Sequence, residues 1–341
     1  MEAPRRAGNE GEGSARDPSE SAYDPGQAAD CANRIRQNVE RVLRGKDEVV
    51  RRAVETLVSG GHLLIEDVPG VGKTTLARAL ASSLDASFSR IQFTSDLLPS
   101  DVTGASVPEV EAGRPTGRFV FHEGPLFSQV VLADEINRAS PKTQSALLEA
   151  MSEGRVTLDG VTHSLPEPFF VVATQNPTEH HGANPLPESQ LDRFHVRLGI
   201  GYPDPEDEAA VLRDDPGQVT LPQLQPVATP TEVLAMRRAC NGVKLDDALI
   251  AYVLAIIGET RAHEAVHLGV STRGALALRR AAQARALVDG RDYCIPEDVR
   301  DLATPVLAHR IITDPRGGAS GAAEEAEWIV REIVEQVPVP L

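Results

Sequence analysis

The chain has 341 residues, of which 41% are hydrophobic and 25% are charged, and its formal net charge is -16 at pH 7. This length allows two domains with separate hydrophobic cores, and no apolar run approaches the roughly 18 residues that a membrane helix requires. The negative charge repels the phosphate backbone of nucleic acids, so we expect neither a membrane span nor a nucleic-acid partner.

The beginning of the chain and its cysteines favour a cytoplasmic protein. The first residues lack the apolar centre of a signal peptide. The cysteines Cys31, Cys240 and Cys294 form no C-x-x-C pair and have no histidine at zinc-ligand spacing, so we expect neither a disulfide nor a zinc site. Residues 1–30 are rich in Gly, Pro, Ser and acidic residues. We expect them to form a disordered tail, because they cannot bury enough apolar surface.

The stretch 62–81 predicts a strand, a glycine turn and a helix, in that order. Its segment P-G-V-G-K-T-T matches the core of a Walker A loop, in which backbone N–H groups and a helix N-terminus face a phosphate chain. Lys73 would reach the β- and γ-phosphates, and the Thr74 hydroxyl would ligate Mg²⁺. A glycine turn with a chance lysine is the simpler alternative, which the flanking strand and helix disfavour.

One residue departs from the full Walker A pattern, because Asp67 occupies a position that usually holds glycine. A carboxylate beside phosphates is electrostatically unfavourable. We therefore expect the Asp67 side chain to point away from the phosphates or to be hydrogen-bonded.

A pair of acids follows the next strongly apolar strand. The segment 98–127 first interrupts regular structure with many prolines and glycines, and we interpret it as a surface insertion or a working loop. The strand predicted at 129–133 then ends in Asp134 and Glu135. Asp134 would hold the hydrated Mg²⁺ and Glu135 would orient and polarise the attacking water. An acid pair that only caps a helix is the alternative, and it is less expected downstream of a Walker A loop.

Further elements can be placed by their turn and cap residues. Ser140 and the following proline predict the start of a helix, and an Asp-Gly pair predicts a β-hairpin at 155–165. Another apolar strand ends before Asn176, whose amide would face the same crevice and could bond the γ-phosphate and the water. Prolines mark a linker, beyond which four stretches with helical spacing predict a helical domain. Three of these stretches follow N-cap residues, Thr229, Asp246 and Ser271. Arg273 begins one of these helices, where a cation needs a nearby anion such as phosphate; a surface arginine is the default alternative.

The motifs G-V-G-K-T, G-P-L-F, L-A-D-E-I-N-R-A, A-T-Q-N-P, L-P-E-S-Q-L-D-R-F and G-V-S-T-R occur in this order. In combination they closely resemble the MoxR family of AAA+ ATPases, over about residues 33–313. The resemblance implies an α/β fold: a P-loop αβα sandwich with a five-stranded parallel sheet at 31–202, a linker at 203–228 and a small all-α lid domain at 229–341. It also implies a homo-oligomeric ring, usually a hexamer, that binds ATP and Mg²⁺.

The resemblance also assigns roles to individual residues. Asn176 corresponds to sensor 1, Arg273 to sensor 2, and Arg193 to an arginine finger that reaches the neighbouring subunit's nucleotide, while Arg138 is a weaker candidate for a second interface arginine. The segment at about 104–125 corresponds to the helix-2 insert of the family and 155–165 to its pre-sensor hairpin, both of which face the pore of the ring. The implied nucleotide contacts are Pro69, Gly70, Val71, Gly72, Lys73, Thr74 and Thr75; the Mg²⁺ ligands are Thr74 and Asp134; the catalytic residues are Glu135, Asn176, Arg193 and Arg273.

The resemblance implies a chaperone-like ATPase that remodels or matures protein clients, including metal-cofactor insertion, often with a von Willebrand factor A domain partner. ATP would touch both the P-loop and Arg273 of one subunit, and its loss would let the lid rotate on the linker. Two alternatives stay open. One is a magnesium-chelatase-type motor subunit, and the other is a nucleotide-gated binding scaffold with little turnover.

Overall fold

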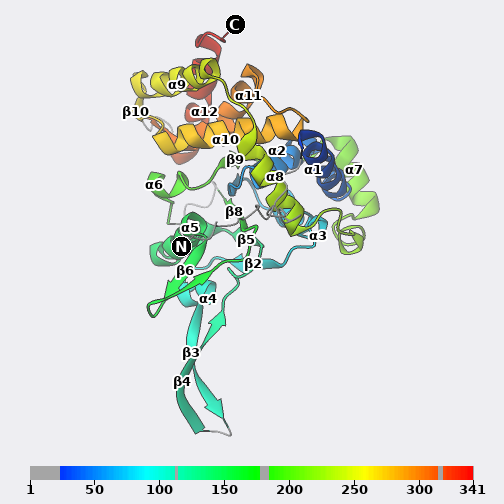
Figure 1. Cartoon of the computed structure of the whole chain (residues 1–341), viewed down its shortest axis with the longest axis vertical. Helices are drawn as coiled ribbons and strands as arrows, with labels where there is room; N and C mark the ends of the chain where they lie inside the picture. Colours follow the sequence, from blue (N-terminus) through cyan, green and yellow to red (C-terminus); the bar gives the residue numbers. More distant parts are fainter. Residues whose placement is uncertain (1–23, 112–113, 177–183, 314–317, 341) are drawn as a thin grey trace, which may run out of the picture.

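Figure 1 shows the computed structural model, which describes residues 24–111, 114–176, 184–313 and 318–340. Most of the tail expected at 1–30 lies outside these ranges, but its last residues do not form a tail. They begin helix α1 (Pro25–Glu40), because Asp24 accepts a hydrogen bond from the Gln27 backbone N–H and Ala28 is buried. The capping pair and the buried face thus start helix α1 upstream of the expected boundary.

The central sheet has five parallel strands in the order β2-β5-β8-β1-β9, which confirms the predicted sheet. Its three inner strands, β5, β8 and β1, are buried on both faces, as is usual when helices cover a parallel sheet from two sides. Because the strands are parallel, the loops that follow β1, β5 and β8 leave at the same edge. The strands are β1 (Leu63–Glu66), β2 (Phe88–Gln92), β5 (Val130–Asp134), β8 (Phe170–Gln175) and β9 (Val196–Leu198).

Alternate residues of each strand face two different hydrophobic layers. Leu63 and Ile65 pack in the layer that contains α1, α2 (Asp47–Val58) and α3 (Lys73–Ser83). Leu64, between them, packs in the layer that contains α5 (Pro141–Glu153), whose predicted N-cap Ser140 accepts a hydrogen bond from the Thr143 backbone N–H. The helices on the two faces therefore complete an αβα sandwich.

The helical lid packs directly on the first domain. Helix α10 lies against both α1 and α2, and buried residues of the lid and of the first domain form one continuous hydrophobic cluster. Three of its helices begin after the N-cap residues expected from the sequence, Thr229, Asp246 and Ser271. The lid helices are α8 (Pro230–Gly242), α9 (Asp247–Ala262), α10 (Thr272–Val288), α11 (Pro296–Leu307) and α12 (Gly318–Gln336), with the short strands β10 (Val266–Leu268) and β11 (Ile312–Thr313).

The stretch expected as a linker at 203–228 contains helix α7 (Pro205–Asp214) and a 3-10 turn, η3 (Leu221–Gln223). It is attached to the first domain at several points. Asn38 donates to the Gln225 carbonyl oxygen at 3.0 Å, and Arg44 forms an ion pair with Asp214 at 2.7 Å. Rotation of the lid about this stretch would break these contacts and expose the shared core, so the packing opposes the expected hinge.

A two-stranded antiparallel ribbon projects from the body at the end opposite the lid (Figure 1). It lies within the segment interpreted as an insertion, between α4 (Pro99–Thr103) and β5, and consists of β3 (Gly104–Glu111) and β4 (Arg114–Glu123). The predicted hairpin is confirmed as β6 (Arg155–Leu158) and β7 (Val161–Ser164). The ring of Phe121 on β4 stacks on that of His163 on β7, with centroids 4.0 Å apart, so the two hairpins are in contact.

Within the described ranges, no helix is long and apolar enough to cross a membrane.

Asp298 provides a test of the lid's internal packing. Its side chain is 1% exposed and accepts two hydrogen bonds of 2.7 Å from Arg291 and one of 2.8 Å from the Ile295 backbone N–H. Replacing Asp298 with alanine removes the closest counter-charge of Arg291 and leaves only the more exposed Asp289, at 3.2 Å. We expect a loss of about 3–5 kcal/mol in the free energy of unfolding. Urea denaturation measures this loss.

The matched control is Asp301→Ala on the same helix. Asp301 pairs with Arg285 at 2.6 Å but is 50% exposed, so its removal should cost less than about 1 kcal/mol. Equal losses for the two variants would contradict the prediction.

Candidate functional site

A pocket of about 330 Å³ opens at the edge of the sheet where β1, β5 and β8 end. Almost all of the residues predicted for the P-loop and for the two other strand ends line it. One predicted residue, Val71, is instead buried in the hydrophobic core beneath the loop. The lining residues are Pro69, Gly70, Gly72, Lys73, Thr74, Thr75, Arg90, Asp134, Glu135 and Asn176.

The glycine loop is shaped by the left-handed backbone at Gly72, where φ is 101°. A side chain there would be strained, and its Cβ would lie 2.7 Å from the Leu43 side chain. Helix α3 starts at the next residue, Lys73, and the first N–H groups of a helix have no partner within it. The pocket therefore presents a helix N-terminus without a covering side chain, which is a favourable setting for phosphate.

The Asp67 carboxylate does not line this pocket. It accepts hydrogen bonds from the backbone N–H groups of Ile200 at 2.7 Å and Gly201 at 2.6 Å, at the end of β9. The carbonyl oxygen of the same residue accepts a hydrogen bond of 2.5 Å from the Lys73 ammonium. Asp67 thus links the start of the P-loop to the segment that follows β9. Its carboxylate is hydrogen-bonded there, away from the expected phosphate position.

Asp134, at the tip of β5, is held through both of its oxygens. Oδ2 forms an ion pair with Arg90 at 2.6 Å, and Oδ1 accepts a hydrogen bond from the Thr174 hydroxyl at 2.6 Å. Thr174 lies on the neighbouring strand β8, and its hydroxyl also accepts the Glu135 backbone N–H at 2.9 Å. These contacts fix the carboxylate at the pocket wall.

Glu135 has a left-handed backbone, with φ 56°, which is uncommon for a residue with a side chain. Its Oε2 accepts hydrogen bonds from the Gln92 amide at 2.8 Å and from the Arg138 guanidinium at 2.9 Å. Arg138, the weaker candidate for an interface arginine, is therefore paired within its own chain. Asn176 is buried beside these residues and also lines the pocket.

Sequence reasoning missed Arg90 and Gln92. Both stand on β2 with one residue between them, so they face the same side of the strand, and the parallel register pairs Gln92 with Asp134. The alternation in S-F-S-R-I-Q-F contained the signal for a shared face. Their place beside the acids depended on β2 and β5 being neighbours, which no local pattern specifies.

The oxygen donors of the pocket suit Mg²⁺. The Thr74 hydroxyl and the Asp134 carboxylate line the same space, and Mg²⁺ is usually held by one or two such groups together with phosphate oxygens and water. The described part of the chain has no cluster of three His, Cys, Asp or Glu side chains that could hold a metal ion alone. A metal ion at this site would therefore depend on the phosphates as ligands.

Two predicted arginines are not among the residues lining the pocket. Arg193 follows the short helix α6 (Glu188–Leu191) and donates a hydrogen bond to the Leu148 carbonyl oxygen on α5. Arg273, at the start of α10, is exposed and lies 3.8 Å from Asp192, the residue before Arg193. The start of α10 is attached to Asp192 by hydrogen bonding and ion pairing. Contact of Arg273 with the ATP bound by its own P-loop stays a prediction.

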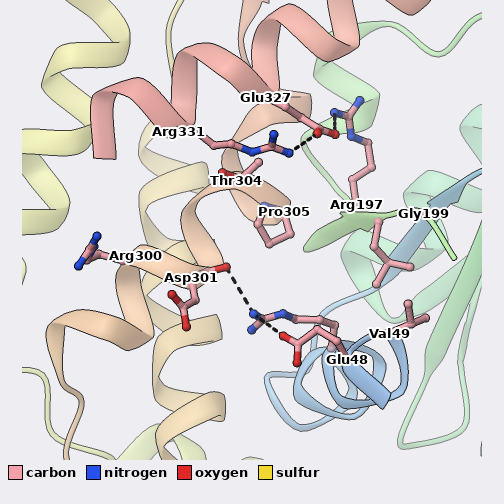
Figure 2. A pocket seen from close by; sticks show the side chains of 12 residues that line it. Glu48, Val49, Arg197, Gly199, Arg300, Asp301, Thr304, Pro305, Glu327 and Arg331 are labelled. Atoms are coloured by element: carbon pink, nitrogen blue, oxygen red, sulfur yellow. Dashed lines mark hydrogen bonds and ion pairs between the residues drawn. The ribbon is translucent and has the colours of Figure 1, made fainter. Parts of the chain in front are cut away.

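A larger pocket, of about 430 Å³, lies between the lid and the first domain, lined by α2, β9, α11 and α12 (Figure 2). Its charged groups pair with one another. Arg197 of β9 contacts Glu66 at 3.0 Å and the lid residue Glu327 at 3.2 Å, and Glu327 also pairs with Arg331. We interpret this pocket as an ion-paired seam that fastens α12 to the sheet.

Comparison with known proteins agrees with this architecture. A family described as "ATPase family associated with various cellular activities (AAA)" matches residues 62–196, and one described as "AAA lid domain" matches residues 258–333. The uncharacterized protein YeaC of Bacillus subtilis is 48% identical over 305 residues, which cover 89% of this chain and 93% of that protein.

Two further similarities extend over most of the chain. The chaperone MoxR1 of Mycobacterium tuberculosis is 39% identical over 311 residues, which cover 89% of this chain and 80% of that protein. The crystal structure of a Cytophaga hutchinsonii protein matches with a TM-score of 0.82 at 36% identity, and the match covers 93% of this chain and 98% of that one.

The position of Asp67 makes a prediction about the P-loop. Asp67→Gly would complete the usual Walker A pattern, yet it removes the acceptor of the Ile200 and Gly201 N–H groups. Because hydrogen bonds to a charged group contribute about 1.5–3 kcal/mol each, we expect a loss of about 2 kcal/mol or more in stability. We also expect weaker nucleotide binding. Urea denaturation and titration with a fluorescent ATP analogue measure the two effects.

Asp67→Asn is the control, because its amide oxygen can still accept one of these hydrogen bonds. Its effects should lie between those of the wild type and of Asp67→Gly. Tighter nucleotide binding by Asp67→Gly would show that the carboxylate hinders the site.

Proposed function

The chain belongs to the MoxR family of AAA+ ATPases, and from this premise we propose that it hydrolyses ATP in a homo-oligomeric ring, with six subunits as the expected number. The observation that carries the proposal is a division of the catalytic set. Lys73, Asp134 and Asn176 share one pocket. Neither Arg193 nor Arg273 lines it, and Arg273 instead lies 3.8 Å from Asp192, the residue before Arg193. Neither part is a complete site for phosphoryl transfer, so two subunits are needed to complete one.

The pocket residues have separable roles in this proposal. Residues Pro69–Thr75 bind the phosphates of ATP, with Lys73 leaving the Asp67 carbonyl oxygen to meet the β- and γ-phosphates. Thr74 and Asp134 would hold Mg²⁺, which neutralises charge on the phosphates when bound. Arg90 pairs with Oδ2 of Asp134 at 2.6 Å, so this carboxylate would hold Mg²⁺ through a coordinated water or after Arg90 moves away.

Glu135 is proposed as the residue that orients and activates the attacking water. Both Gln92 and Arg138 donate to Oε2 of its carboxylate, and these donors lower the tendency of the carboxylate to accept a proton from water. Asn176 lies in the same pocket and could bond both the γ-phosphate and the water. The glutamate contacts thus provide a resting arrangement with low activity.

Arg193 and Arg273 are proposed to act together on the nucleotide of a neighbouring subunit. Arg273 lies within 3.8 Å of Asp192, which directly precedes Arg193, and this supports a shared role. Assembly would then activate hydrolysis, since an arginine finger supplied in trans contributes on the order of 10³ to 10⁵ in rate in other phosphoryl-transfer systems.

Remodelling of protein clients is the proposed output. The projecting ribbon exposes apolar side chains, including Phe119 and Val110, and its contact with the β6–β7 hairpin through Phe121 and His163 lets both hairpins move together. Metal-cofactor maturation and a von Willebrand factor A domain partner are proposed from the family relationship alone. The cytoplasmic location expected from the sequence stays a prediction.

The ring proposal predicts that ATPase activity per subunit rises with protein concentration. Arg193→Ala should lower the assembled rate on the order of 10³-fold and leave ATP binding by dilute protein unchanged, because the arginine acts on another subunit. Glu135→Gln should also stop turnover while preserving ATP binding. Phosphate release and nucleotide titration, each over a range of protein concentrations, measure these effects.

Arg273→Ala should behave as Arg193→Ala does. Weakened ATP binding by dilute Arg273→Ala protein would instead indicate that this residue serves its own pocket. A wild-type rate per subunit that is absent, or that stays constant through assembly, would favour a binding scaffold.

A further inference from the structure

The guanidinium of Arg310 holds the turn that carries Arg193. Arg310 ends a 3-10 turn, η4 (Ala308–Arg310), in the lid, and its side chain is only 2% exposed. It donates hydrogen bonds to the Asp192 carboxylate at 2.8 Å and to the carbonyl oxygens of Phe194 at 2.5 Å and His195 at 3.3 Å. A lid residue therefore contacts the backbone immediately before and after Arg193.

The same guanidinium lies against the start of α10, which carries Arg273. Ser271, the N-cap of α10, donates a hydrogen bond from its hydroxyl to the second Asp192 oxygen at 3.2 Å. Gly274, in the first turn of α10, leaves space for Arg310, because a Cβ at this position would lie 2.9 Å from the Arg310 Cδ. Arg310 and Asp192 thus join the segment of Arg193 to the helix of Arg273.

The chemistry of the contact requires an arginine. A planar guanidinium can donate to a carboxylate and to several carbonyl oxygens in fixed directions at once, whereas a lysine ammonium acts as a compact point charge. Burial lowers the pKa of Arg310 to about 10, with the nearby Asp192 carboxylate opposing the shift, so the group remains cationic at neutral pH.

We propose that Arg310 is a positioning residue that presents Arg193 and Arg273 as one rigid unit to the nucleotide of a neighbouring subunit. This inference rests on the proposed function and extends it. The lid is then part of the arginine finger, and it does not act as a mobile cover over its own subunit's ATP.

Mixed rings test the inference. Arg310→Lys keeps the positive charge but loses the planar set of N–H donors. We expect the turnover of this variant alone to fall about 10- to 100-fold, because small misplacements of catalytic groups reduce rates by such factors. Glu135→Gln protein has defective pockets but intact arginines. An equal mixture of the two should recover about a quarter of the wild-type rate, because one in four random interfaces in a head-to-tail ring joins an intact pocket to intact arginines.

A second mixture separates this inference from the proposed function. Arg193→Ala mixed with Glu135→Gln should recover activity in the same way if catalysis is shared between subunits. Failure of that mixture would overturn the proposed function. If that mixture recovers activity but the mixture of Arg310→Lys with Glu135→Gln does not, the role proposed for Arg310 is wrong. A wild-type rate for Arg310→Lys alone would also overturn that role.

The matched control is Arg237→Lys. Arg237 is another largely buried lid arginine, and it donates to the Leu57 carbonyl oxygen of the first domain at 3.0 Å, away from the Arg193 turn. We expect Arg237→Lys to retain the wild-type rate. If Arg237→Lys instead loses activity that Glu135→Gln protein restores in mixed rings, attachment of the lid in general would explain the loss, and the specific role of Arg310 would be overturned.

If Arg310→Lys does not fold, Asp192→Asn decides the question. It removes the charge from the less buried partner and keeps a hydrogen-bond acceptor. We expect the same loss and the same recovery in mixed rings, with unchanged ATP binding by dilute protein. A loss that Glu135→Gln protein does not rescue would overturn the inference.

Discussion

The ion pair between the buried Arg310 and the less buried Asp192 attaches the lid to the first domain at a defined point. The two residues are 118 positions apart in the chain, and their contact at 2.8 Å attaches the lid beside the turn of Arg193. Removing either charge would leave the other poorly compensated in a site that excludes most water, so the contact is costly to break. The same Asp192 contacts Arg273 and Ser271 at the start of α10, so this attachment also fixes the position of that helix.

The nucleotide pocket, in contrast, depends on sheet geometry. The chain segments that follow three parallel strands leave at one edge of the sheet. The acids, the amide of Asn176 and the glycine loop therefore lie close together there. Arg90 adds a positive charge beside Asp134. The pocket thereby keeps its carboxylates satisfied in the arrangement described here, and ligand binding must exchange these internal partners for external ones.

Local chemistry made much of this predictable from the sequence. Caps at Ser140 and Ser271, the Asp-Gly hairpin and the acids at the end of an apolar strand each depend on a few adjacent residues, and the structure agrees with them. Arg90 and Gln92 were missed because their role requires the order of strands in the sheet. The contact of Arg273 with Asp192 was missed for a related reason. A helix start can be recognised locally, but its docking partner is a residue far along the chain.

The projecting ribbon has a consequence for the behaviour of the protein in concentrated solution. Two strands alone leave their outer N–H and C=O groups unpaired, and such edges invite pairing between copies and aggregation. Pro108 in β3 removes one donor from its edge, and the register shifts between Pro108 and Val110. Charged residues such as Arg118 in the exposed strand β4 add repulsion between like edges. The ribbon can therefore stay exposed to solvent and to other proteins, while its edges resist pairing with the ribbon of another copy of the chain.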